Sequence, residues 1–197
     1  MSQVDRQRRE RTHGRMHMKD RSISLNKLIL ERGEERVSSL LSTFKCTADA
    51  DAEYFLKNKA IMHERDSISR TYITLGFKPE GTLVKGYFTL AVKCFVVGER
   101  CTVPSEIWKL MNVNNGVAQS YLLGQLAKAD GTEKGLGKTM IERALYNFGE
   151  GKATFGCRTV RLDCKDEPKL MEYYVSFGFE FMRRDEKRNL NQMVMII

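Results

Sequence analysis

The stretch over 121–148 constrains the fold more strongly than any other part of the chain. It opens with an apolar run over 121–127, which predicts a buried strand, and a polar turn over 128–134 follows. After the turn, apolar residues recur at the spacing of a helix face as far as Phe148. The stretch therefore predicts a strand, a turn and a helix in direct succession.

Two glycines, Gly135 and Gly137, stand where the turn meets the predicted helix. Glycine lets the backbone approach a ligand closely, and the unpaired N–H groups at the start of a helix favour an anion. Lys134 and Lys138 add positive charge at the same place. This arrangement is typical of a phosphate-binding turn, although a Gly-x-Gly pair on its own fits a plain turn as well.

A second landmark follows the predicted helix. It consists of a strand over 157–164 and a short helix that carries Tyr173 and Tyr174 and ends before Gly178 and Phe179. Together with the glycine-rich turn, this landmark resembles the GCN5-related N-acetyltransferases, the GNAT superfamily. Those enzymes bind acetyl-coenzyme A through a strand, a pyrophosphate loop and a helix, and further on they carry a helix with a tyrosine before a Gly-Phe pair.

The resemblance implies direct attack of a neutral amine on the acetyl thioester. Tyr174, which is preferred over Tyr173 by its distance from the Gly-Phe pair, would protonate the leaving thiolate as a general acid. A backbone N–H at the splayed strand would stabilise the oxyanion, and no general base is evident. The residues that would hold the pantetheine arm and the pyrophosphate are Leu126, Ala127, Lys128, Glu133, Lys134, Gly135, Leu136, Gly137 and Lys138.

One position departs from the pattern of the superfamily. The pyrophosphate loop reads Gln/Arg-x-x-Gly-x-Gly/Ala in these enzymes, and Thr132 occupies the Gln/Arg position here. The difference bears on how the pyrophosphate is bound and how tightly. It also motivates an alternative function, in which a GNAT scaffold with little or no catalytic activity serves as a nucleic-acid or protein binding module.

The resemblance covers 22–197 and reaches into the N-terminal half, where segments 44–46, 55–60, 70–72 and 86–90 are similar to the acetyltransferases of bacterial toxin–antitoxin pairs, phages and mobile elements. Those toxins acetylate the free amine of aminoacyl-tRNA. The resemblance therefore implies a primary amine as acceptor, with aminoacyl-tRNA as the candidate, and an antitoxin or a second copy of the chain as protein partner. The amine of an aminoacyl ester has a lower pKa than lysine and needs less help from a base.

The charge of the chain fits a polyanionic partner. The formal net charge is +8 and the pI is near 9.3, and 1–21 contributes half of that charge. We expect 1–21 to form a flexible basic arm that either contacts nucleic acid or is simply solvated, and 22–197 to form a single domain. A competing interpretation takes 22–30 as a small ribbon-helix-helix DNA-binding element.

The cysteines and the hydropathy exclude other classes. Five cysteines are present without a Cys-x-x-Cys pair, and the three histidines do not cluster with them, so no metal site is expected. Cys94 and Cys164 lie within apolar strand patterns, which favours buried free thiols in a reducing compartment. No apolar run approaches the roughly 18–20 residues that span a bilayer, so we expect a cytoplasmic protein without a membrane partner.

The remaining elements complete a predicted fold. Periodicity predicts a strand over 22–30, helices over 34–44, 47–60 (or on to His63) and 104–110, hairpin strands over 70–75 and 83–97, a connection over 149–156, a helix from 167, a strand from 179, a charged turn over 183–189 and a last strand over 192–197. This order predicts an α/β fold with a mixed, mostly antiparallel sheet flanked by helices. By the resemblance, a splayed parallel strand pair would form the cofactor cleft.

Overall fold

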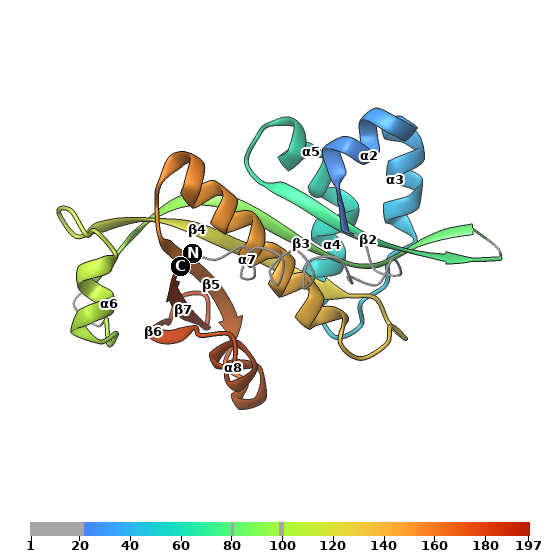
Figure 1. The fold of residues 1–197 in the computed structure, drawn as a ribbon. Helices are drawn as coiled ribbons and strands as arrows, with labels where there is room; N and C mark the ends of the chain where they lie inside the picture. Colours follow the sequence, from blue (N-terminus) through green and yellow to red (C-terminus); the bar gives the residue numbers. More distant parts are fainter. Residues whose placement is uncertain (1–21, 80, 99–100) are drawn as a thin grey trace, which may run out of the picture.

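The computed structural model describes residues 22–79, 81–98 and 101–197. The described strands form one seven-stranded sheet in the order β1-β2-β3-β4-β5-β7-β6 (Figure 1). They are β1 (Ser22–Ser24), β2 (Arg70–Lys78), β3 (Gly81–Val96), β4 (Val117–Lys128), β5 (Thr159–Lys165), β6 (Glu180–Asp185) and β7 (Leu190–Ile196). Every pair is antiparallel except β4 with β5, so the predicted mixed, mostly antiparallel sheet is confirmed.

Helices cover both faces of this sheet. They are α2 (Leu25–Arg32), α3 (Glu34–Ser42), α4 (Ala50–Asn58), α5 (Ala60–Arg65), α6 (Ser105–Leu110), α7 (Leu136–Phe155) and α8 (Pro168–Val175). Neighbouring residues along a strand point to opposite faces, and β3 shows the division. Tyr87 packs into the cluster formed with α2 to α5, whereas Phe88 packs into the cluster formed with α7 and α8. A third cluster, next to α6, covers the end of the sheet around Phe95.

The predicted strand over 22–30 is wrong for most of its length. Only Ser22–Ser24 pairs with β2, and α2 begins directly afterwards. The Ser24 side chain accepts a hydrogen bond from the Lys27 N–H and thereby caps the helix. Leu25 and Leu28, which alternation assigned to a strand, are both fully buried on one helix face. This segment therefore belongs to the edge of the common sheet.

The predicted connection over 149–156 is also wrong, because α7 continues through it to Phe155. Gly149 and Gly151, two of the three glycines in the predicted connection, suggested a break there. Gly151 instead allows close packing, since a Cβ at this position would lie 3.0 Å from the Tyr121 hydroxyl oxygen. The helix ends at Gly156, whose φ of 79° is in the left-handed region that glycine tolerates.

The structure differs from the sequence prediction in three smaller ways, which concern the helix over 47–60, the turn over 183–189 and the burial of one cysteine. The predicted helix over 47–60 begins only at Ala50, after the capping residue Asp49, and gives way to α5 at Ala60. The charged turn is shorter than predicted, because β6 continues to Asp185. All five cysteines are free thiols, but Cys94 is exposed, so its expected burial is wrong.

The predicted basic arm over 1–21 lies outside the described residues. None of the described helices combines the length and the apolar character that crossing a membrane requires.

Candidate active site

β4 and β5 run side by side over only three residue pairs and then diverge. The pairs are Tyr121 with Val160, Leu122 with Arg161 and Leu123 with Leu162. Beyond them, β4 continues along β3 as far as Lys128, while β5 continues along β7. Among the described strands, the backbone groups of 124–128 that face β5 therefore have no ladder partner. Such groups must bind water or a ligand.

A bulge at Gly124 accompanies the divergence. The register between β3 and β4 shifts there, because Thr89 pairs with Gln125 whereas Leu90 pairs with Leu123. The Gln125 N–H donates to the Thr89 hydroxyl at 2.8 Å, and a Cβ at Gly124 would lie 2.9 Å from the same oxygen. A bulge increases the local twist and bends its strand. Gly124 and Thr89 thus direct the end of β4 away from β5.

The loop after β4 is attached to β3 through Lys85. The Lys85 carbonyl accepts hydrogen bonds from the Ala129 N–H at 2.8 Å and from the Thr132 hydroxyl at 3.1 Å. The Lys85 ammonium pairs with the Glu133 carboxylate, which holds the pKa of Glu133 below its usual range. Thr132, which replaces the Gln or Arg of the superfamily pattern, thus fastens the loop to the sheet.

The first turn of α7 lies directly on β3. A Cβ at Gly86 would come within 3.0 Å of the Met140 sulfur and 3.2 Å of Leu136 Cδ2. Gly135 has a φ of 98°, in the left-handed region, and no side chain caps the helix that follows. The N–H groups of the first turn therefore remain available to an anion, and the dipole of this long helix favours one.

The structure brings the predicted cofactor residues together at this point. Leu126, Ala127 and Lys128 form the end of β4, Glu133 and Lys134 lie in the loop, and Gly135, Leu136, Gly137 and Lys138 open α7. The side chains do not all face the cleft. Ala127 packs into the cluster under α2 to α5, and Lys138 lies 3.9 Å from Glu142 of the next turn. Ala127 and Lys138 would therefore contribute to cofactor binding through their backbone groups.

The two tyrosines of α8 occupy different surroundings. Tyr174 is only 8% exposed and packs edge-on against Phe179, with 6.0 Å between the ring centroids. Its burial raises the pKa of the phenol above the ordinary value, so the group stays protonated at neutral pH. Tyr173 is half-buried, and its hydroxyl oxygen lies 3.1 Å from a Cβ built at Gly137. Tyr173 therefore reaches the first turn of α7, which the sequence did not indicate.

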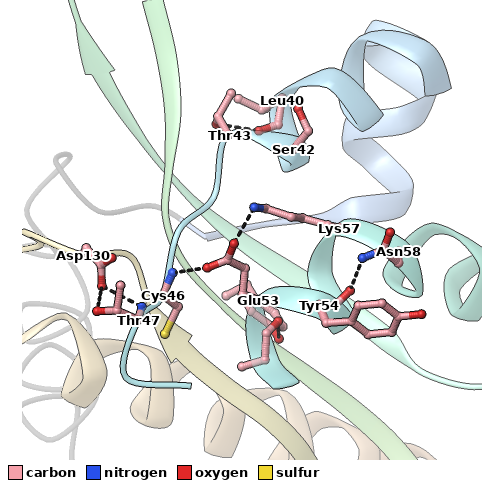
Figure 2. A network of polar contacts seen from close by, with 12 residues as sticks. Leu40, Ser42, Thr43, Cys46, Thr47, Glu53, Tyr54, Lys57, Asn58 and Asp130 are labelled. Carbon is pink, nitrogen blue, oxygen red and sulfur yellow. Dashed lines mark hydrogen bonds and ion pairs between the residues drawn. The ribbon is translucent and has the colours of Figure 1, made fainter. Parts of the chain in front are cut away.

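A segment that sequence reasoning missed closes one side of the cleft. This crossing segment, defined as 45–49, joins α3 to α4. Its Thr47 donates to Asp130 from both the N–H and the hydroxyl, at 3.0 and 3.1 Å (Figure 2). On the other side, the Lys165 ammonium at the end of β5 lies 3.2 Å from Asp49. Because it contacts the ends of both diverging strands, the crossing segment lies across the opening between them.

No family model and no curated protein matches the chain by sequence. Solved structures do resemble it. AtaT complexed with acetyl-methionyl-tRNAfMet has a TM-score of 0.64 and 23% identity over 79% of this chain and 86% of that one. A tyrosine-to-phenylalanine mutant of KacT has a TM-score of 0.67 and 20% identity over 83% and 91% of the two chains. AtaTR bound with AcCoA has a TM-score of 0.61 and 27% identity over 79% and 86%.

AtaT and KacT are toxin acetyltransferases with the GNAT fold. The strand β4, the glycine-rich loop, the helix α7 and the splayed pair of β4 and β5 occur in the order that the sequence resemblance implied. The fold of the chain is therefore that of the GCN5-related N-acetyltransferase superfamily, and its structural neighbours include members of the toxin branch.

Proposed function

We propose that the protein transfers an acetyl group from acetyl-coenzyme A to a primary amine, and that this amine is the free amino group of an aminoacyl-tRNA. The observation that carries the proposal is the divergence of β4 from β5 beside the uncapped first turn of α7. It leaves a row of backbone hydrogen-bonding groups next to an anion-binding helix start.

The residues at the cleft fit acetyl-coenzyme A. The free backbone groups at Leu126, Ala127 and Lys128 would pair with the amides of the pantetheine arm. The N–H groups over 133–138 would bind the pyrophosphate, with Lys134 contributing positive charge. The bound cofactor would supply an acetyl group activated as a thioester.

The chain's own groups then account for the reaction. The cleft would hold the amine beside the thioester carbonyl, an arrangement that can contribute several kcal/mol through proximity. A free backbone N–H of β4 would stabilise the oxyanion as the C–N bond forms. The C–S bond then breaks, and the Tyr174 phenol would give its proton to the leaving thiolate, while the amine loses a proton to water and that proton restores the phenol.

Two observations favour aminoacyl-tRNA as the acceptor. The chain has a net charge of +8, which suits a polyanionic substrate. AtaT, one of the similar structures, is complexed with acetyl-methionyl-tRNAfMet, which carries an acetylated amine. An aminoacyl ester amine also suits a site in which sequence reasoning found no general base.

The test uses titration calorimetry followed by an acceptor screen. We expect acetyl-coenzyme A to bind at one site per chain, and radiolabelled acetyl groups to appear on charged tRNA but not on uncharged tRNA. Absence of binding at millimolar cofactor, together with tight binding of nucleic acid, would instead support the binding-module alternative.

A further inference from the structure

A cavity of about 310 Å³ lies beside the crossing segment, on the side away from Asp130. Cys46 and Thr47 of the crossing segment line it, together with Tyr54, Lys57 and Asn58 of α4. Figure 2 shows these side chains around the α4 surface. The volume is at the lower end of the range for small-ligand sites, which suits a single small group rather than an extended chain.

Tyr54 gives this cavity an aromatic wall. Its side chain is 57% exposed, and its ring points away from the Glu53 network (Figure 2). The Asn58 side-chain amide, which also lines the cavity, donates to the Tyr54 backbone carbonyl at 2.9 Å and is thereby held on the α4 surface. Exposed aromatic rings of this kind stack on the unpaired bases of single-stranded nucleic acid.

The charges around the cavity permit an anion at its rim. The negative charge of Glu53 is balanced by its partners. One carboxylate oxygen accepts from Lys57 Nζ at 2.6 Å and the other from the Cys46 N–H at 2.7 Å. These contacts, the one from Lys57 first, hold the pKa of Glu53 below its usual range. Lys45 of the crossing segment is exposed, and its positive charge also helps to hold the pKa of Glu53 low, although among the described residues no carboxylate lies within ion-pair distance of its ammonium. It can therefore meet a phosphate.

The cavity and the cleft lie on opposite sides of one stretch of backbone. Thr47 lines the cavity and also bonds to Asp130, two residues beyond the end of β4. Asp49 of the same segment contacts Lys165 at the end of β5. In an aminoacyl-tRNA, the amino acid is esterified to the ribose of the 3′-terminal nucleotide, so its amino group is separated from the terminal base only by that ribose, the ester and the Cα atom.

We propose that this cavity binds the 3′-terminal nucleotide of the acceptor RNA, with the base stacked on Tyr54 and the phosphate near Lys45. The proposal rests on the proposed function. It assigns the recognition of RNA to the crossing segment and α4, whereas the chemistry belongs to the cleft.

The experiment compares two acceptors that share the same amine. One is a charged tRNA, and the other is the methyl ester of the same amino acid, which has no nucleotide. The measured quantity is the ratio of kcat/KM for the tRNA to kcat/KM for the ester. Replacement of Tyr54 by alanine should lower this ratio by roughly tenfold, in line with the loss of one stacked base. Tyr54→Phe keeps the ring and should keep the ratio.

Tyr146→Ala is the matched control, because Tyr146 is a comparably exposed tyrosine, 50%, on α7. Its ratio should equal that of the wild type. An unchanged ratio in Tyr54→Ala would overturn the nucleotide proposal while leaving the acetyltransferase intact. The nucleotide proposal would also be overturned if the wild type acetylates peptide amines and Tyr54→Ala impairs that reaction equally. A wild type that acetylates neither acceptor would instead refute the proposed function.

Discussion

At the scale of single residues, the candidate site depends on hydroxyl groups whose surroundings differ. Tyr174 is buried against Phe179, Tyr173 reaches Gly137, and Thr132 is bonded to the Lys85 carbonyl. Each of these side chains has a counterpart that differs mainly in the oxygen atom. Paired substitutions can therefore separate chemistry from packing.

The first prediction concerns Tyr174. Replacement by phenylalanine keeps the ring against Phe179 and removes only the proton donor, so the dissociation constant of acetyl-coenzyme A should stay close to that of the wild type. Turnover should fall at least tenfold, since general acid catalysis typically contributes about 10²–10⁴ in rate. Single-turnover kinetics and calorimetry measure the two quantities. If Tyr173→Phe shows this pattern and Tyr174→Phe does not, the roles of the two residues are reversed.

The second prediction concerns Thr132. Valine has nearly the same shape but cannot donate to the Lys85 carbonyl, which loosens the loop. The dissociation constant of acetyl-coenzyme A should rise roughly fivefold, which corresponds to about 1 kcal/mol for one hydrogen bond, while turnover at saturating cofactor changes little. Thr132→Ser keeps the hydroxyl and serves as the control. Equal affinities for all three proteins would show that Thr132 does not set the shape of the loop.

At the scale of elements, the contact between β3 and α7 positions the helix start. The missing side chain of Gly86 leaves room for Leu136 and Met140 of α7. The Ala127 carbonyl of β4 also lies close to this position. Gly149, near the middle of the same helix, has no atom within 4 Å of a Cβ built on it. Two glycine-to-alanine substitutions should therefore have opposite effects.

The third prediction compares these two substitutions. Gly86→Ala would place a Cβ 2.9 Å from the Ala127 carbonyl oxygen, so it should destabilise the fold by about 1–3 kcal/mol through overpacking. It should also weaken cofactor binding, because α7 must shift. Gly149→Ala should stabilise the protein by about 0.5–1 kcal/mol, since alanine is the better helix former. Urea denaturation measures both, and a loss of stability in Gly149→Ala would contradict the helix as described.

At the scale of the whole molecule, the sheet consists of two parts joined by three parallel residue pairs. β1 to β4 form one part, and β5 to β7 form the other. The core cluster under α7 and α8 bridges them, because it contains residues of β3, β4, β5 and β7. A ligand held between the two parts would therefore contact both and oppose their separation.

The fourth prediction follows from this arrangement. Acetyl-coenzyme A at a hundredfold excess over its dissociation constant should stabilise the protein by about 2.7 kcal/mol, which raises Tm by roughly 5–10 °C for a chain of this size. Thermal denaturation monitored by circular dichroism measures the shift. Acetyl-pantetheine, which lacks the pyrophosphate, should give a smaller shift at equal concentration. Equal shifts would show that the loop and the start of α7 do not hold the pyrophosphate.

The sequence predicted the parts of the fold that depend on contiguous residues. The strand, turn and helix around Gly135 and the helix that carries Tyr174 follow from local periodicity. The crossing segment does not, because Thr47 meets Asp130 across 83 positions and Lys165 approaches the Ala48 carbonyl across 117. Local patterns carry no signal for such contacts. The extent of α7 was missed because packing on Tyr121 outweighs the low helix propensity of Gly151.

The attachment of the cofactor loop to Lys85 has a consequence for the thermodynamics of binding. A loop whose shape is already fixed loses little conformational freedom when its ligand arrives. The amide hydrogens of Ala129, Asp130 and Thr132, which donate to backbone carbonyls, should therefore exchange slowly with deuterium even in the free protein. The negative heat-capacity change of cofactor binding should therefore match the apolar surface that the cofactor itself buries. A loop that folded on binding would make this change more negative.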